Sequence, residues 1–504
     1  DAVHHAGTFT LKKRAFVEYW RYKLSAFVVF YQSKSRAFGV TSDYKKRLWR
    51  MFLDQKRAGE VVFRRKIYDL LLEWKRTSVG RTAALIEGAR RVGKSTVAEE
   101  FGRREYRSCI LIDFSTASKA TKALFDDVSD LNYLFLQLQL QYKVDLYKRA
   151  SVIIFDEVQE CPRARQAIKH LVKDRRYDYI ETGSLISIKR NVRDIIIPSE
   201  ERKLNMYPMD YEEFLWALGD TVSYQIIRKF YDLGKPVGAE LNRKLLRNFR
   251  LYMLVGGMPQ AVSEYIKTNN FKYVDLVKRD ILSLYADDFT KIDATGRAAR
   301  LFDTVPAQLN QNASRFHVSS VLSRNIRADD ILHLIAEMQA SKTVLLSYRV
   351  NDPNVGMSAS IDLTKFKIYI CDSGLFTTLM FKDRDFTDND IYEKLLSDKL
   401  PANLGYLYEN VVAQMLTASG NNLFYHTLMD KTSKHNYEVD FLIARQNKIC
   451  ALVVKSSGYK SHTSLDKFCE KYTGGIQHKY LVYTKDYDRD GDVICLPVYM
   501  VPFL

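Results

Sequence analysis

The stretch that decides the fold reads Leu85-Ile86-Glu87-Gly88-Ala89-Arg90-Arg91-Val92-Gly93-Lys94-Ser95-Thr96. It carries the spacing G-x-x-x-x-G-K-S and directly follows the apolar residues 83–86. A buried strand, a turn with two glycines and a helix beginning at the lysine form the setting in which this spacing holds phosphate. The N–H groups of the turn and the positive end of the helix dipole both favour an anion. We therefore predict a nucleotide-binding loop, whose residues are Gly88, Ala89, Arg90, Arg91, Val92, Gly93, Lys94, Ser95 and Thr96.

Two acidic residues downstream complete a site for hydrolysis around this phosphate-binding loop (P-loop). Lys94 can reach the β- and γ-phosphates, and the Ser95 hydroxyl is an oxygen ligand of the kind Mg²⁺ takes. The apolar run 151–155 ends in Asp156 and Glu157. We predict that Asp156 holds Mg²⁺ opposite Ser95, and that Glu157 orients or deprotonates the attacking water. ATP and Mg²⁺ are therefore the expected ligand and cofactor, and Lys94 and Glu157 are expected catalytic residues.

A fourth predicted strand, 177–184, ends in the small polar residues Thr182 and Ser184. We expect one of the two to sense the γ-phosphate, and we count Ser184 among the catalytic residues. A strand inserted between the two nucleotide-binding strands, with an acid after the metal-binding aspartate, is typical of the hydrolytic P-loop folds. The arginine that would stabilise transferred charge stays open among four candidates, which are Arg190, Arg193, Arg202 and Arg279.

Composition and charge point to an anionic partner. The 504 residues carry a formal net charge of +17, and residues 1–50 hold 11 Lys and Arg against 3 Asp and Glu, interleaved with aromatic residues. Nucleic-acid binding, a basic amphipathic helix packed on the rest of the protein and a leader segment are all interpretations of this stretch. No apolar run reaches 18 residues, and the six cysteines form no C-x-x-C pair. We expect a cytoplasmic protein without a membrane span.

Four motifs in sequence carry a family resemblance: GARRVGKST at 88–96, IIFDEVQECP at 153–162, IETGSL at 180–185 and MYPMDYEEFL at 206–215. Over about residues 62–485 the chain resembles a prokaryotic family of AAA-type ATPases whose C-terminal half is similar to the restriction-endonuclease fold. The resemblance implies an α/β P-loop fold with a parallel sheet and a helical lid. Residues 256–259, Gly-Gly-Met-Pro, resemble the G-x-P element of related signalling ATPases, which implies that Pro259 in the lid touches adenine.

Five segments are expected along the chain. A basic aromatic segment (1–60) precedes the P-loop core (61–220), a helical lid (221–295), a winged-helix-like module (296–385) and a restriction-endonuclease-like domain (386–504). The winged-helix assignment rests on three helical runs followed by the strands 344–349 and 366–371. Its third helix carries Asp329 and Asp330 where a DNA-reading helix needs basic or amide side chains, so we expect mainly a packing element.

The C-terminal segment carries the nuclease pattern D…E-x-K with one of its residues replaced. Asp440 and Lys455 are present, but Val453 stands at the glutamate position. Glu409, on the preceding helix, is the acid that could compensate, whereas Glu438 is expected to lie too far along its strand from Asp440. The resemblance thus implies a nuclease-like remnant of Glu409, Asp440 and Lys455, and we expect no cleavage of nucleic acid because a metal would lack carboxylates.

These observations favour an AAA-type molecular switch that binds ATP and hydrolyses it slowly. A nucleic-acid-binding protein that uses ATP binding only as a conformational effector is the alternative, and an ATP-gated nuclease is a third hypothesis. A nucleic acid, an unidentified protein and a second copy of the chain stay open as partners.

Overall fold

The computed structural model describes residues 62–183, 199–311, 315–318, 321–322, 327–354, 356–383, 389–397, 405–429, 436–457 and 461–504. The chain divides into two compact units, residues 1–62 and 63–504, and everything below concerns the second. The basic segment predicted at 1–60 lies outside the described residues. Among the helices that the structure describes, none has the length and apolar character needed to cross a membrane.

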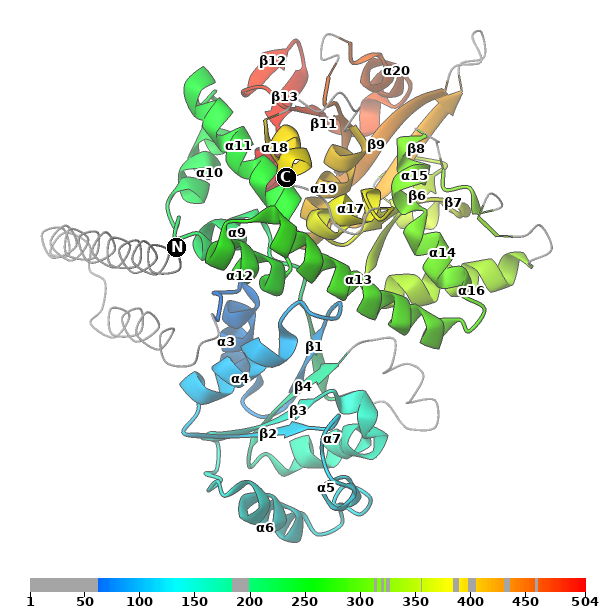
Figure 1. Ribbon diagram of the computed structural model, residues 1–504. Coiled ribbons are helices and arrows are strands. Elements are labelled where there is room, and N and C mark those ends of the chain that lie inside the picture. The colour runs from blue at the N-terminus through cyan, green and yellow to red at the C-terminus, as the bar shows by residue number, and fades with distance from the viewer. Residues whose placement is uncertain are drawn as a thin grey trace, which may run out of the picture. The chain divides into compact units, whose positions relative to one another are not determined.

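A five-stranded parallel sheet forms the P-loop core (Figure 1). Its strands are β1 (Ala83–Glu87), β2 (Ser108–Asp113), β3 (Ser151–Asp156), β4 (Asp178–Gly183) and β5 (Glu201–Asn205). The order is β2-β3-β4-β1-β5, and every neighbouring pair is parallel. β4 lies between the P-loop strand β1 and the acid-tipped strand β3, which confirms the predicted insertion. The carboxyl ends of β1, β3 and β4 therefore meet at one edge of the sheet.

Helices cover both faces of this sheet, as the near-continuous apolar character of its strands requires. The helices are α3 (Ile67–Ser78), α4 (Lys94–Glu105), α5 (Lys119–Ala123), α6 (Leu131–Tyr142) and α7 (Pro162–Asp174). Successive side chains of a strand point to opposite faces. Accordingly, Ala84 and Ile86 share a hydrophobic cluster with α3 and α4, whereas Ala83 and Leu85 share one with α6 and α7. The P-loop thus sits at the end of a strand that is packed on both sides.

The predicted lid is helical. It contains α9 (Tyr211–Ala217), α10 (Ser223–Leu233), α11 (Ala239–Val255), α12 (Pro259–Thr268) and α13 (Phe271–Ile292). Asp210 and Glu213 close a capping box at the start of α9. The short helices α14 (Arg297–Asp303) and α15 (Val305–Asn310) and the longer α16 (Ala328–Ala340) follow.

An eight-stranded mixed sheet forms the C-terminal half, in the order β12-β13-β11-β10-β9-β8-β6-β7. Its strands are β6 (Val344–Val350), β7 (Ile361–Ile370), β8 (Phe424–Met429), β9 (Asn436–Arg445), β10 (Lys448–Val454), β11 (Ile476–Tyr483), β12 (Asp488–Asp490) and β13 (Val493–Pro497). The helices of this half are α17 (Ser373–Met380), α18 (Asn389–Leu396), α19 (Gly405–Ala418) and α20 (Thr463–Lys471).

The two strands expected for a winged helix belong to this second sheet. β6 and β7 pair antiparallel, and β6 joins β8 in parallel through Tyr348 and Arg349. Asp329 and Asp330 on α16 are exposed. A winged-helix module with its own boundaries therefore stays a prediction.

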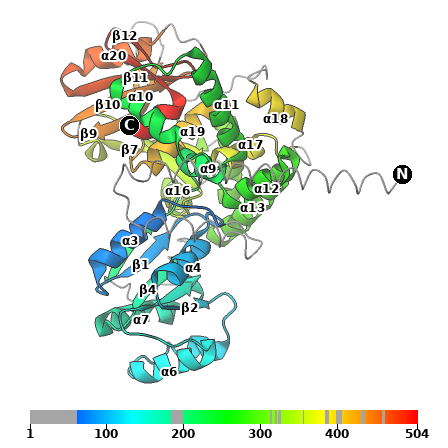
Figure 2. The same cartoon turned by 90° about the vertical axis from the view of Figure 1, so that its left-hand side faces the viewer.

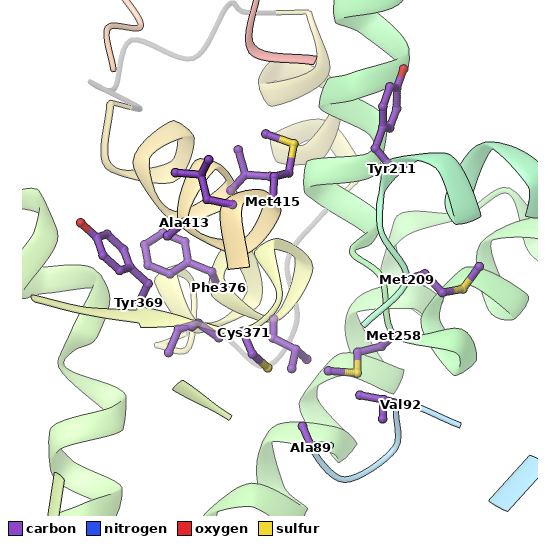
Figure 3. Close-up of a cluster of buried hydrophobic side chains, with 14 of the residues drawn as sticks. Ala89, Val92, Met209, Tyr211, Met258, Tyr369, Cys371, Phe376, Ala413 and Met415 are labelled. Atoms are coloured by element: carbon purple, nitrogen blue, oxygen red, sulfur yellow. The ribbon is translucent and has the colours of Figure 1, made fainter. Parts of the chain in front are cut away.

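One hydrophobic cluster runs from the P-loop into the C-terminal half. It includes Ala89 and Val92 on the loop, Met258 before α12, and Cys371 and Phe376 around the start of α17. Figure 3 shows Ala89 and Val92 beside Met258, with Cys371 and Phe376 further along the same cluster. Because such cores are close-packed, a displacement at one end is resisted along its length.

Candidate nucleotide-binding site

The P-loop connects β1 to α4, and both of its motif glycines meet a steric demand. A Cβ atom at Gly88 would lie 2.2 Å from the carbonyl oxygen of Met206. Gly93 has φ 96°, a conformation that L side chains rarely adopt. The sequence spacing is therefore what allows the backbone to curl at this point.

Lys94 lies inside the curl of the loop. Its Nζ donates hydrogen bonds to the carbonyl oxygens of Gly88 and Ala89, at 3.1 and 2.9 Å. Burial lowers the pKa of Lys94 to about 8, against the opposing influence of Glu157 and Asp156. A desolvated ammonium that donates its hydrogen bonds to two neutral carbonyls gains strongly from an anion, since charge-assisted hydrogen bonds are the stronger ones.

Three oxygen atoms meet beside the loop, each from a different element. The Ser95 hydroxyl on α4 donates to Oδ1 of Asp156 at the end of β3, at 2.7 Å. The Thr182 hydroxyl on β4 donates to the same oxygen. Hydroxyl and carboxylate oxygens are ligands of the kind Mg²⁺ prefers, so Ser95 and Asp156 fit this ion. The structure thus brings the two predicted metal ligands together.

Glu157 follows directly after β3 in a left-handed conformation, with φ 50° and ψ 48°. A non-glycine residue in this region is uncommon and often occurs at functional positions. Its carboxylate accepts a hydrogen bond from the side-chain amide of Gln159. The motif reasoning did not single out Gln159, which lies two residues further on in the same turn. Ser184, predicted as catalytic, lies outside the described residues, as do Arg190 and Arg193.

Arg65, which the sequence reasoning missed, ties the P-loop to its surroundings. Its guanidinium is buried and donates to the carbonyl oxygens of Val92 at 2.7 Å and Tyr207 at 2.6 Å. Its Nε forms an ion pair with Oε2 of Glu213 at 3.1 Å. Glu213 also accepts the backbone N–H of Lys66 at 2.6 Å. No local pattern marks Arg65, because the three residues that it contacts are all distant from it in sequence.

The helical lid also contacts the P-loop, through α12 and α13. A Cβ atom built on Gly93 would lie 3.6 Å from Cγ of Pro259, so the proline ring packs against the loop. From α13, the Tyr285 hydroxyl donates to the carbonyl oxygen of Arg90 at 3.0 Å, and Asp288 pairs with the Arg90 guanidinium at 3.0 Å. Pro259 is thus positioned beside the P-loop, where the resemblance places an adenine contact.

Two of the arginine candidates are engaged elsewhere. Arg202 on β5 pairs with Glu73 at 3.3 Å. Arg279 on α13 pairs with Asp275 at 2.8 Å and donates to the carbonyl oxygen of Phe381 at 3.0 Å. Both side chains are thus paired with residues outside the P-loop, and no arginine finger is assigned.

The nuclease-like remnant differs from the expectation. Carboxylate oxygens of Glu409, Glu438 and Asp440, the acidic cluster, lie within 4.8 Å of one another. The prediction that Glu438 lies too far from Asp440 is therefore wrong. Residues two apart on a strand face the same side, and side-chain length closes the distance between their backbones.

A lysine that the sequence reasoning missed lies among these acids. Nζ of Lys367 on β7 donates to Oε1 of Glu409 at 2.9 Å and also to Glu438. Burial alone would lower the pKa of Lys367, but Glu409 and Glu438 outweigh it and raise that pKa well above its usual value. Burial raises the pKa of Asp440, and Glu409 adds to the effect. Lys455, the expected partner of Asp440, donates instead to the carbonyl oxygen of Ser461.

Comparisons with known proteins agree with the architecture of the P-loop core. A family model described as "AAA domain" matches residues 80–215. Two models described as "Domain of unknown function" (DUF8612 and DUF4143) match residues 246–385 and 404–501. The comparison with curated proteins found no match.

Among solved structures, the ORC1 protein of Aeropyrum pernix in complex with DNA matches at 12% identity, covering 68% of this chain and 94% of that chain, with a TM-score of 0.26. C. elegans PCH-2 matches at 12% identity and a TM-score of 0.20, covering 34% of this chain and only 47% of that chain. A signal transduction ATPase with numerous domains from Pyrococcus horikoshii, PH0952, matches at 10% identity and a TM-score of 0.21, covering 71% and 48%. With TM-scores this low, we draw no inference from these likenesses.

The sheet order, the P-loop at the end of β1 and the family-model match define the class: the chain contains an AAA-type P-loop ATPase domain. The model that matches 404–501 describes a domain of unknown function, so the nuclease-like character of that region stays a prediction.

Proposed function

We propose that the protein binds ATP with Mg²⁺, hydrolyses it slowly and works as a nucleotide-dependent switch. The observation that carries this proposal is the buried Lys94 ammonium inside the P-loop, next to the Ser95–Asp156 pair. A cation and an oxygen-ligand pair side by side fit the phosphates and the metal ion of one bound nucleotide.

Each residue has a distinct role in this proposal. Lys94 and the loop N–H groups hold the β- and γ-phosphates, while Ser95 and Asp156 hold Mg²⁺. The bound ion supplies charge neutralisation of the phosphate oxygens. Glu157 holds the attacking water and accepts its proton. Because no arginine finger is assigned, we expect slow turnover, which suits a switch more than a motor.

Two connections lead from the loop toward the C-terminal half. The first is α13, a single helix of 22 residues. Near one end, Tyr285 and Asp288 contact Arg90. Near the other, buried Asp275 accepts the hydroxyls of Thr378 at 2.7 Å and Tyr392 at 2.8 Å. These contacts support transmission of nucleotide occupancy, because a helix moves as a rigid element.

The second connection runs through the turn before α12. The N–H of Gly257 donates to Oδ2 of Asp372 at 2.5 Å, and the N–H of Leu375 donates to Oδ1 of the same residue at 2.9 Å. Pro259, which packs on the P-loop, lies two residues after Gly257. Asp372 directly precedes α17 and follows β7, the strand that carries Lys367. A shift of Pro259 on nucleotide binding would therefore act on the second sheet.

ATP binding is tested by thermal unfolding of wild type and Lys94→Ala with and without ATP·Mg²⁺. A ligand at about 100 times its dissociation constant stabilises the folded state by about 2.7 kcal/mol. We expect a raised transition in the wild type and none in Lys94→Ala, with exposed Lys169→Ala as the matched control that behaves like wild type. An equal shift in wild type and Lys94→Ala would refute the assignment of the loop.

The alternative, a nucleic-acid-binding protein that uses ATP only as an effector, differs in turnover. It needs the P-loop but not Glu157. ATP hydrolysis that depends on Glu157 favours the switch with hydrolysis, whereas ATP binding without measurable hydrolysis favours the alternative.

A further inference from the structure

Helix α6 of the P-loop core exposes an apolar stripe that the nucleotide site does not use. Its sequence, LNYLFLQLQLQY, is apolar on two sides. Leu134, Phe135 and Leu138 are buried in the cluster beneath the sheet. On the other side, Tyr133, Leu136 and Leu140 are 57%, 64% and 75% exposed. Spacings of three and four residues place these three side chains in one row along the helix.

The location of this row leaves it open to another molecule. α6 forms the outer layer of the P-loop core in both views of the molecule (Figures 1 and 2). Its buried side faces the sheet, so the stripe points away from it. A large contiguous apolar patch on a protein surface marks an interaction site.

The charges at the two ends of the stripe have opposite signs. Asp126, Asp127 and Asp130 are exposed at the amino end of α6. Oδ1 of Asp130 caps the helix by accepting the N–H groups of Asn132 and Tyr133. Lys143, three residues after Leu140, is exposed and caps the carboxyl end of α6 in a left-handed conformation (φ 54°, ψ 43°). From the amino to the carboxyl end, the order is therefore acid, tyrosine, leucine, leucine, lysine, with the acid and the lysine at the two caps of the helix.

This order of charged and apolar residues is complementary to the same residues on a second copy of α6 that runs in the opposite direction. If a second α6 lies antiparallel on the first, the Leu136 side chains of both copies meet at the centre. Each Leu140 then faces the Tyr133 of the other copy, and each Asp130 comes to the Lys143 of the other copy. A two-fold arrangement of this type repeats each contact twice. Opposite charges at the rim specify direction and partner, while the apolar centre supplies affinity.

We propose that the α6 stripe, made of Tyr133, Leu136 and Leu140 with Asp130 and Lys143 at its ends, is the surface through which two copies of this chain pair antiparallel. The pairing does not depend on ATP, so its failure and the failure of the proposed ATPase function are separate results.

The first test is analytical ultracentrifugation of the full chain over a range of concentrations. The wild type should dimerise, and Leu140→Glu should weaken the dimer by at least about tenfold, because the change places a carboxylate in the apolar part of the interface twice, once for each copy. The matched control is Leu233→Glu on α10, where the leucine is 67% exposed. That variant should dimerise like wild type. Circular dichroism checks that both variants keep the helical content of the wild type.

The second test uses charge reversal. Asp130→Lys and Lys143→Glu should each dimerise poorly alone, because like charges then face each other twice. An equimolar mixture should form a heterodimer, because both end contacts then pair opposite charges: the two substituted positions meet with reversed signs, and the remaining Lys143–Asp130 contact keeps its wild-type signs. The loss of the Asp130 cap affects only its own helix and cannot produce this recovery. A monomeric wild type, a dimer unaffected by Leu140→Glu, a dimer broken by Leu233→Glu instead, or a mixture that stays monomeric would each overturn the proposal.

Discussion

Replacing Gly374 with alanine tests the junction between the lid and the C-terminal half. Gly374 is the second residue of α17. A Cβ atom there would lie 2.4 Å from the carbonyl oxygen of Val255 and 2.6 Å from Cα of Gly256. Both are backbone atoms at the end of α11, so a rotamer change cannot relieve the overlap. The substitution therefore separates α17 from the turn that carries Pro259.

Two effects of opposite sign set the change in unfolding free energy that Gly374→Ala produces. Alanine has a higher helix propensity than glycine, by at most about 1 kcal/mol at this first-turn position, which would stabilise α17. Overpacking in a close-packed core typically costs about 1–3 kcal/mol, and a clash against backbone belongs at the upper end. We expect Gly374→Ala to lose about 1–2 kcal/mol of unfolding free energy in net.

The assay is urea unfolding followed by circular dichroism, with Gly475→Ala as the matched control. A Cβ atom at Gly475 would meet no heavy atom within 4 Å, so we expect that variant to unfold like wild type. We also expect ATP to raise the unfolding transition of Gly374→Ala by less than that of wild type, because Gly257 and Pro259 share the displaced turn. If Gly374→Ala is as stable as wild type or more stable, helix propensity decides the outcome and the junction is not tightly packed.

Three further predictions concern the two sites and the pH dependence. Glu157→Gln should still bind ATP but hydrolyse it about 10²-fold more slowly, and equal steady-state turnover in both proteins would contradict its role as base. Lys367→Met leaves the acidic cluster uncompensated and should cost about 3–5 kcal/mol. In thermal unfolding, Mn²⁺ should restore part of the stability lost in Lys367→Met and leave the wild type unchanged. In a cleavage assay, neither protein should cut plasmid DNA. Burial lowers the pKa of His426 to about 4. Between pH 6.5 and 4 the unfolded chain therefore binds a proton that the folded protein does not. As the pH is lowered through this range, the free energy of unfolding decreases by at most about 3 kcal/mol. His426→Phe should flatten this part of the profile, and an unchanged profile would contradict the assignment.

The P-loop and its acidic strand could be predicted from the sequence because their geometry is local. Nine consecutive residues carry the loop glycines, the lysine and the serine, and one apolar strand delivers Asp156 and Glu157. A buried parallel strand followed by a glycine turn leaves the backbone few alternatives. The insertion of β4 was predicted from the same motifs, because an acid after the metal-binding aspartate and a polar-tipped fourth strand are typical of the hydrolytic P-loop folds.

The tertiary structure alone decided which distant side chains meet. Arg65 reaches Glu213 across 148 residues, and Lys367 reaches Glu409 and Glu438 across 42 and 71. No spacing rule connects positions so far apart, so the sequence reasoning missed both basic residues and misplaced Glu438. The contacts of Asp372 with Gly257 and of α13 with the P-loop likewise depend on how the lid packs. Local backbone chemistry determined the nucleotide loop, and long-range packing determined what the loop is connected to.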